Sequence, residues 1–244
     1  MKIQLSEYKK IVVLTGAGVS VASGLKTYRG KNGSETNTNI QYSGHADRLQ
    51  DDPAGLWGFY GPLREKISSA APNAAHAHLA EIEQSLAPNQ GFCLITQNVD
   101  GLHQAAGSKN VIEIHGNLNR SRCSDPRCET ESFTDNSYQK ELPLCAKCGA
   151  IFRPDIVLFG EQLSVDNEWK VKKAMRNCDL FIAIGTSGTV SPASNLVRSA
   201  NYEGARTVIL SLEPMKVKNP YFQEEYLGEA DILVPKILHF QKNK

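Results

Sequence analysis

Two short apolar runs of this chain end on side chains that can bind a ligand or move a proton. The run over residues 92–96 is typical of a buried strand. An amide pair and a carboxylate follow it, namely Gln97, Asn98 and Asp100. A second run, residues 111–114, ends on His115. In an open α/β sheet, ligands bind beyond the carboxyl ends of the strands. There amides can hold a carboxamide, and a histidine can accept a proton near neutral pH.

The same side chains also fit an ordinary interpretation. Asn98 and Asp100 are common in turns, and a lone histidine is often bonded locally. We therefore keep two interpretations open at this point, strand-end loops and a catalytic edge.

A glycine turn follows the first predicted strand, residues 11–14, as Thr15-Gly16-Ala17-Gly18-Val19-Ser20. A strand, glycines and then a helix start is a layout that binds phosphate, because backbone N–H groups face the anion. Glycine also serves tight turns for steric reasons alone, and no Gly-Lys-Ser/Thr follows, so this is not a P-loop.

Four clustered cysteines give the most specific local signal. They follow the pattern C-x4-C, sixteen residues, C-x2-C, at Cys123, Cys128, Cys145 and Cys148. Two such pairs supply the four thiolates of a tetrahedral zinc site, and no open coordination position is indicated. We expect one structural Zn²⁺.

Length and composition favour a globular protein with one large domain or one domain with an inserted module. The chain has 244 residues and a formal net charge of +1, so we expect no dedicated nucleic-acid surface. No export signal or membrane-spanning run is evident, which predicts a cytoplasmic protein without a membrane partner. We expect a monomer.

Alternating strand and helix patterns predict an α/β fold with a doubly wound parallel sheet. Residues 30–48 are polar and predict a long loop that could close over a ligand. Pro62 is expected to kink or divide the helix over 53–67. Residues 232–234 predict a last short strand before a terminal helix.

Taken together, the motifs resemble the sirtuin family of NAD-dependent protein deacylases. The resemblance rests on the glycine turn, the Thr27-Tyr28-Arg29-Gly30 stretch, the segments 96–103 and 114–117, the four cysteines, Arg153-Pro154, Phe159-Gly160-Glu161 and Gly185-Thr186-Ser187. These pieces span nearly the whole chain in the family's order.

The resemblance implies a Rossmann-like large lobe over 1–30, 76–119 and 152–244. It implies a small lobe made of a helical insertion, 31–75, and a zinc-binding insertion, 120–151. NAD, consumed as a co-substrate, would contact Gly16, Ala17, Gly18, Ser20, Tyr28, Arg29, Gln97, Asn98, Asp100, Gly185, Thr186, Ser187, Ser211, Glu213 and Ala230.

The resemblance also implies the reaction. His115 would act as general base while an acyl-lysine peptide gives its acyl group to ADP-ribose, releasing nicotinamide and O-acyl-ADP-ribose. The peptide would add as a strand at the Phe159-Gly160 edge. Substrate contacts would come from Tyr60, Leu63, Val157, Phe159 and Gly160.

Acyl preference depends on the helix around Tyr60. The sirtuin branch that removes succinyl or malonyl groups carries Tyr-x-x-Arg, whereas here Leu63 stands in the arginine position. Arg64 is one residue late, about 100° around the helix. We therefore expect deacetylation to exceed desuccinylation, with Arg64 reaching the pocket as the alternative. The other functions considered are a protein mono-ADP-ribosyltransferase and a non-catalytic NAD-sensing or zinc-ribbon binding module.

Overall fold

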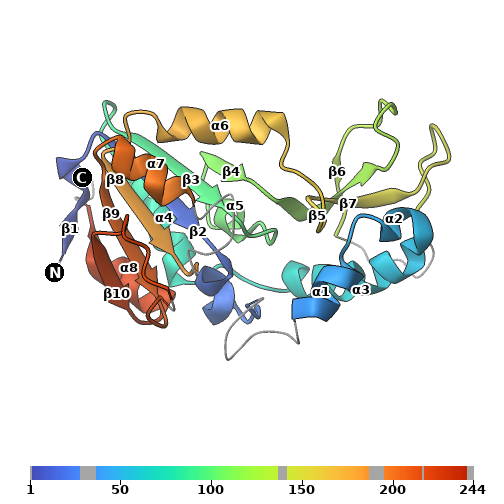
Figure 1. Ribbon diagram of the computed structural model, residues 1–244, viewed down its shortest axis with the longest axis horizontal. Coiled ribbons are helices and arrows are strands. Elements are labelled where there is room, and N and C mark those ends of the chain that lie inside the picture. Colours follow the sequence, from blue (N-terminus) through green and yellow to red (C-terminus); the bar gives the residue numbers. More distant parts are fainter. Residues whose placement is uncertain (1, 28–36, 137–141, 187–194, 216, 241–244) are drawn as a thin grey trace.

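The central sheet of this computed structural model has six parallel strands. The structure describes residues 2–27, 37–136, 142–186, 195–215 and 217–240. The strand order is β10-β9-β8-β2-β3-β4. Their bounds are β2 Lys10–Thr15, β3 Gly91–Thr96, β4 Val111–Glu113, β8 Leu180–Ile184, β9 Arg206–Ser211 and β10 Glu224–Leu227. The predicted doubly wound α/β class is confirmed (Figure 1).

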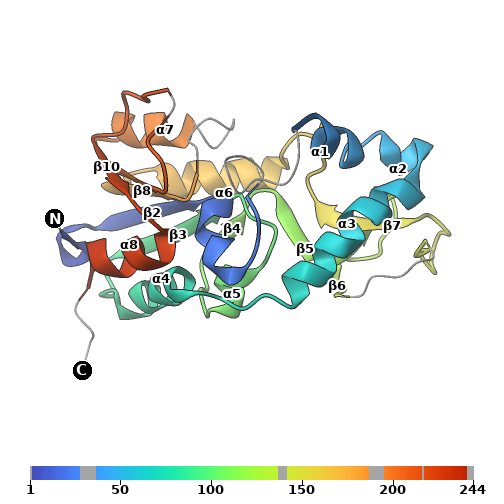
Figure 2. The ribbon, with the colours of Figure 1, turned by 90° about the horizontal axis from the view of Figure 1, so that it is seen from below.

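Helices cover both faces of this sheet. On one face lie α4, Ala74–Ser85, and α8, Ala230–Ile237 (Figure 2). On the other lie α6, Val165–Met175, and α7, Leu196–Tyr202. Alternate residues of β2 enter the two cores, Ile11 on the α4 side and Val12 on the α6 side. Burial on both faces explains why this strand reads as a continuous apolar run.

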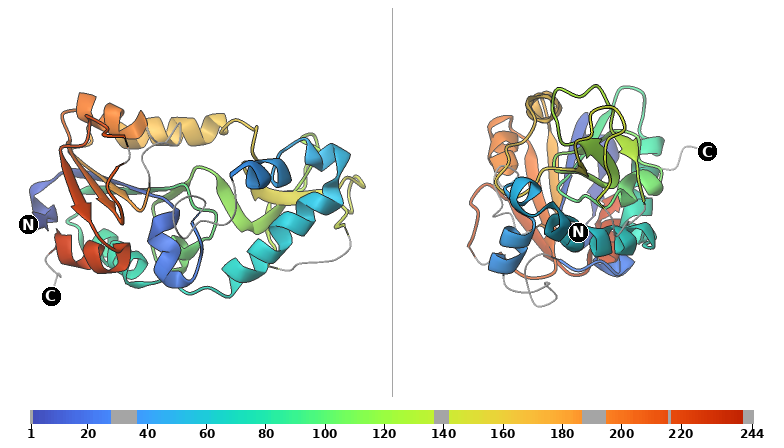
Figure 3. Two further views of the ribbon diagram at one scale, coloured as in Figure 1. Left: turned by 60° about the horizontal axis from the view of Figure 1, so that its bottom comes forward. Right: turned by 90° about the vertical axis from the view of Figure 1, so that its right-hand side faces the viewer.

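A second, antiparallel sheet lies at the far end of the molecule from both termini (Figure 3). It contains β5 Gly116–Cys123, β6 Phe133–Thr134 and β7 Phe152–Ile156, in the order β6-β5-β7. The helices α1 Asn37–Ser43, α2 Arg48–Asp51 and α3 Pro53–Ser68 lie beside it. The remaining elements are short: β1 Ile3–Gln4, β11 Leu238–His239, α5 Leu102–Ala105 and the 3₁₀ helices η1 Leu5–Glu7 and η2 Ala17–Ser23.

Local signals explain the helix starts. Asn73 caps α4, accepting a hydrogen bond from the amide of Ala75, and His76 completes a capping box. Asp52 caps α3 by accepting from the amide of Gly55, and Pro53 stands at the first helical position. No helix of the described residues is long and apolar enough to cross a membrane.

Two predictions about elements were wrong. The described part of the expected 30–48 loop contains α1 and the first residue of α2. Residues 232–234 belong to α8 rather than to a strand, because Ala230, Leu233, Val234 and Ile237 form one buried helical stripe. Of the two alternatives for Pro62, division of the helix is contradicted, because α3 continues through it from Pro53 to Ser68, whereas a kink stays a prediction.

Candidate functional site

A cavity of about 710 Å³ opens at the carboxyl ends of β2, β3 and β8. It continues along the segment after β7 and reaches α1 and α3. The residues that line it are Gly16, Ala17, Gly18, Thr27, Ile40, Gln41, Tyr60, Gln97, Asn98, Val99, His115, Ile156, Val157, Leu158, Phe159, Gly160, Glu161, Gln162, Leu163, Glu168, Gly185 and Thr186.

His115 lies on this cavity, where β4 turns into β5. Its Nδ1 is 2.9 Å from the carbonyl oxygen of Gln97, which can only accept, so the proton is on Nδ1 and the lone pair on Nε2. Burial lowers the pKa of His115 below its usual value, although the Gln97 hydrogen bond opposes that shift. The imidazole is therefore neutral at pH 7 and suited to accept a proton.

A main-chain hydrogen bond joins His115 to the segment after β7. The carbonyl of His115 accepts a hydrogen bond from the amide of Val157 at 2.9 Å. Asn167 of α6 donates from Nδ2 to the carbonyl of Glu113 at 3.2 Å, just before the histidine. Both contacts restrain the main chain that carries the base.

Asn98, Ser20 and Asp100 form one buried network, and only Asn98 lines the cavity. The Ser20 hydroxyl donates to Asp100 at 2.7 Å and accepts from Asn98 Nδ2 at 3.1 Å. Asn98 Nδ2 also donates to the carbonyl of Gly16 at 3.2 Å. The structure thus brings these predicted residues together, with Ser20 and Asp100 acting from behind Asn98.

The glycine turn packs closely against the main chain of Ile184 and Gly185, which limits the side chains it can carry even without a ligand. A Cβ atom on Gly18 would lie 2.7 Å from the carbonyl oxygen of Gly185. The amide of Gly18 donates to that oxygen at 2.8 Å, and the amide of Gly16 donates to Ile184 at 3.0 Å. The steric interpretation of these glycines therefore holds beside the ligand-binding one, and a phosphate would rely on other donors of the turn.

Of the remaining predicted NAD contacts, some line the cavity and others do not. Gln97 and Thr186 meet at the cavity, with Gln97 Nε2 donating to Thr186 Oγ1 at 3.2 Å. The structure does not place Ser211, Glu213 or Ala230 on the cavity. The Ser211 hydroxyl donates to the carbonyl of Glu213 at 2.9 Å, at the end of β9. Tyr28, Arg29 and Ser187 lie outside the described residues.

The expected peptide edge is partly occupied. The amide of Phe159 donates to the carbonyl of Gly44 at 3.2 Å, and the carbonyl of Phe159 accepts from Ala46 at 3.0 Å. These bonds form a parallel bridge between His45 and Phe159. The main-chain groups of Phe159 are thus bonded to another segment of the same chain, and the pairing of a peptide at this edge stays a prediction.

Arg64 does not reach the cavity. Its side chain is fully buried under β5 and donates to the carbonyl of Leu118 at 2.8 Å and to Asp135 at 2.7 Å. The alternative that it enters the acyl pocket is contradicted. Tyr60 lines the cavity and donates to the carbonyl of Gly44 at 3.2 Å, whereas Leu63 packs in the neighbouring apolar cluster without lining the cavity.

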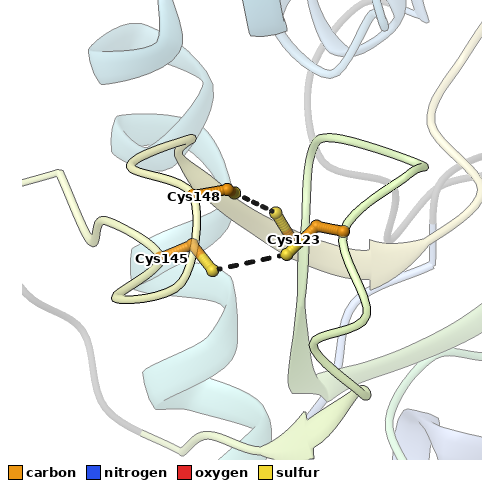
Figure 4. A group of neighbouring side chains, drawn as sticks. Cys123, Cys145 and Cys148 are labelled. Carbon is orange, nitrogen blue, oxygen red and sulfur yellow. Dashed lines mark hydrogen bonds between the residues drawn. The ribbon is translucent and has the colours of Figure 1, made fainter.

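Four thiols gather between β5 and the turn before β7. Figure 4 shows Cys145 and Cys148 with their sulfur atoms toward Cys123. With Cys128, all four Sγ atoms lie within 4.8 Å of one another, and two pairs are 3.5 and 3.7 Å apart. Tetrahedral Zn–S bonds of about 2.3 Å place sulfurs roughly 3.8 Å apart, so this donor set fits a zinc ion.

Several lining residues escaped the sequence analysis. Ile40 and Gln41 of α1 lay in the expected loop, and Glu168 lay in a helix with no site assigned. Ile40 is 8% exposed and is an isolated aliphatic residue in a polar stretch. A single aliphatic residue in a polar stretch is the sequence feature that could have predicted burial of Ile40.

Comparisons with known proteins agree with this geometry. A family model described as "Sir2 family" matches residues 16–192. A curated relative from Pasteurella multocida, named NAD-dependent protein deacylase, is 40% identical over 236 residues, covering 96% of this chain and 98% of the relative.

Solved structures also resemble the chain throughout. A Sir2 homolog–NAD complex superposes with a TM-score of 0.84 at 35% identity, covering 95% of this chain and 89% of that one. A structure described as Sir2 with a p53 peptide and NAD⁺ has a TM-score of 0.79 at 32% identity, covering 95% and 93%.

Proposed function

This chain belongs to the Sir2 family, and on that premise we propose that it is an NAD-dependent protein-lysine deacylase. Its co-substrate is NAD, and its other substrate is a protein or peptide with an acylated lysine. The acyl group passes to ADP-ribose, which makes the enzyme a transferase.

The observation that carries the proposal is His115 on the cavity wall as a neutral imidazole. The Nδ1 contact with Gln97 leaves Nε2 as the proton acceptor. In the proposed reaction the acyl oxygen bonds to the ribose carbon as the bond to nicotinamide breaks. His115 Nε2 takes the proton from a ribose hydroxyl, which then attacks the acyl carbon. Water enters, and lysine, nicotinamide and O-acyl-ADP-ribose leave.

The network beneath the cavity suits the nicotinamide end of NAD. Asn98 is held by Ser20 and Gly16, and its carbonyl side can accept from a carboxamide. The Gly16–Gly18 turn, Gln97 and Thr186 would hold the ribose and phosphate region. The four cysteines would hold a structural zinc ion that stabilises the β5–β7 module.

We propose that acetyl-lysine is preferred over succinyl-lysine. The described residues that line the cavity include no lysine or arginine. A succinyl carboxylate would therefore enter a pocket whose described lining offers it no cation, which is costly. The engagement of Arg64 with Asp135 supports the same preference.

The test is NAD-dependent turnover of two peptides that differ only in carrying acetyl- or succinyl-lysine. We expect higher kcat/KM on acetyl, and a loss of about 10²- to 10⁴-fold in His115→Ala with ADP-ribose binding retained. Leu63→Arg should raise succinyl turnover, because residue 63 lies one helical turn from Tyr60. Glu65→Arg is the matched control, since it adds the same residue on an exposed position of α3.

Three results would count against the proposal. A wild-type preference for succinyl would overturn the acyl assignment. Full activity in His115→Ala would overturn the assigned base. Transfer of labelled ADP-ribose onto protein, without peptide turnover, would replace deacylation with mono-ADP-ribosylation.

We also propose a cytoplasmic location. The cysteines of the described chain are free thiols, and a four-thiolate zinc site suits a reducing compartment. Zinc-loaded protein recovered from the cytoplasmic fraction is the expected result, and disulfide-linked protein from an oxidising compartment would contradict it.

A further inference from the structure

The segment from Val157 to Gly160 lines the cavity without belonging to a regular element. It follows β7, which ends at Ile156, and precedes α6, which begins at Val165. A segment of this kind has no ladder of its own to fix its main chain. Its shape must come from contacts with residues outside it.

One such contact is a bidentate ion pair behind the segment. Arg153 is 4% exposed, and its guanidinium bonds both carboxylate oxygens of Glu161, at 2.5 and 2.8 Å. The same guanidinium donates to the carbonyl of Ile156 at 2.9 Å, and Glu161 accepts from the amide of Leu158 at 2.8 Å. One ion pair therefore holds both ends of the turn and an amide within it.

The other side of the segment is held by the bridge to Gly44 and Ala46. Gly160 adopts φ of +88°, and a Cβ atom there would lie 2.5 Å from His45 Nε2. The turn is thus fixed between the ion pair and the bridge. Arg153 does not line the cavity, so any effect of Arg153 on a ligand must pass through this turn.

We propose that Arg153 and Glu161 are positioning residues for the acyl-lysine peptide, a role that rests on the proposed deacylase function. The pair sets the main chain of residues 157–160 before the peptide arrives, so binding does not have to order it. The predicted NAD contacts lie on the turns after β2, β3 and β8 instead. Loss of the pair should therefore weaken peptide binding and spare the nucleotide.

The variants are Arg153→Lys, which keeps the charge without the bidentate geometry, and Glu161→Gln, which keeps the shape without the charge. Glu224→Gln is the matched control. Glu224 pairs with Arg206 through both oxygens, at 2.6 and 3.0 Å, on strands away from the cavity. Peptide KM and kcat, ADP-ribose affinity by calorimetry and zinc content are measured for each.

We expect peptide KM to rise about tenfold in Arg153→Lys and in Glu161→Gln, which corresponds to ~1.4 kcal/mol. The kcat should stay within about twofold, and ADP-ribose affinity and zinc content should be unchanged. The peptide KM of the double variant should not exceed that of the more impaired single variant, because both changes remove the same contact. Glu224→Gln should match the wild type in every measurement.

An unchanged peptide KM in both variants would overturn the proposal. Additive effects in the double variant would also overturn it, since the two residues would then act separately. Equal losses of peptide and ADP-ribose binding would indicate general damage to the fold and overturn it as well.

Failure of the proposed function is recognised separately. If the wild type turns over no acyl peptide, calorimetry with the acetyl-lysine peptide still compares binding by the wild type and Glu161→Gln. Equal affinities in that experiment, or no binding by either, would overturn the positioning role. If Arg153→Lys does not fold, Glu161→Gln alone decides between the outcomes.

Discussion

Replacing Arg64 with methionine should destabilise the small antiparallel module strongly. Arg64 is 0% exposed and makes polar contacts across the space between α3 and β5. It donates to Asp135 at 2.7 Å, to the carbonyls of Leu118 at 2.8 Å and Arg120 at 3.1 Å, and to the hydroxyl of Ser121 at 3.0 Å. Methionine fills much of the space but donates to none of these acceptors.

The expected cost follows from the charge that is left behind. Removing one partner of a buried ion pair costs about 3–5 kcal/mol, because the other charge stays buried. The Asp135 side chain is 17% exposed, so water offsets only a small part of this. At about 2–4 °C per kcal/mol for a chain of this size, the midpoint of thermal unfolding should fall by roughly 10 °C.

Fluorescence of Trp57 offers a local assay. The Arg64 guanidinium lies 4.8 Å from the Trp57 ring centre, and Trp169 is the second of the two tryptophans. In a Trp169→Phe background, the tryptophan fluorescence therefore reports on the contact between α3 and the antiparallel sheet during urea unfolding. The control is Arg48→Met, which breaks the Arg48–Asp52 pair, whose Asp52 side chain is 52% exposed, and should cost less than about 1 kcal/mol.

Two results would refute this reasoning. A cost below about 1 kcal/mol for Arg64→Met would show that the buried contacts contribute little net stability. Loss of a wild-type succinyl activity in Arg64→Met, at unchanged stability, would return Arg64 to the acyl pocket. Asp135→Asn should lower stability as well, and its effect should not add to that of Arg64→Met.

Three further outcomes are expected. Burial lowers the pKa of His115 below 6.5, and the base acts when neutral. The midpoint of the acid limb in a pH profile of kcat/KM should therefore lie below 6.5; a midpoint at or above 6.5 contradicts this. Removing zinc with a chelator should unfold the β5–β7 module, seen as lost circular dichroism and peptide turnover; retained structure after metal loss contradicts it. Gly18→Ala forces a Cβ atom 2.7 Å from the Gly185 oxygen and should raise the KM for NAD at least tenfold, whereas Gly58→Ala, with open space, should not.

The central sheet was predictable because its strands are buried on both faces. A parallel strand between two helical layers must be apolar at every position, so residues 11–14 and 92–96 stand out without any periodicity. The polar residues that follow each run lie at one sheet edge by topology alone. This is why Gln97, Asn98 and His115 could be placed at the cavity from sequence.

Short windows explain the misassigned elements. Residues 232–234 are three aliphatic residues, which favours a strand when they are considered alone. The longer stripe of Ala230, Leu233, Val234 and Ile237 recurs at three- and four-residue steps and identifies the helix. In residues 37–43 the polar composition concealed α1, because only Ile40 of its described side chains is buried.

Long-range partners account for what the sequence left open at the site. Helix geometry predicts that Arg64 points about 100° away from the arginine position of the Tyr-x-x-Arg pair, and Arg64 does not line the cavity. In that direction Arg64 contacts Asp135, which is 71 residues away along the chain. No local sequence pattern predicts this pairing. Phe159 is similar, because its motif marks an edge but not that Gly44 and Ala46 occupy it. Local pattern therefore predicts where a side chain or an edge lies, whereas tertiary packing decides whether a ligand or the chain itself fills it. At this site that distinction separates a succinyl-binding arginine from a buried structural one.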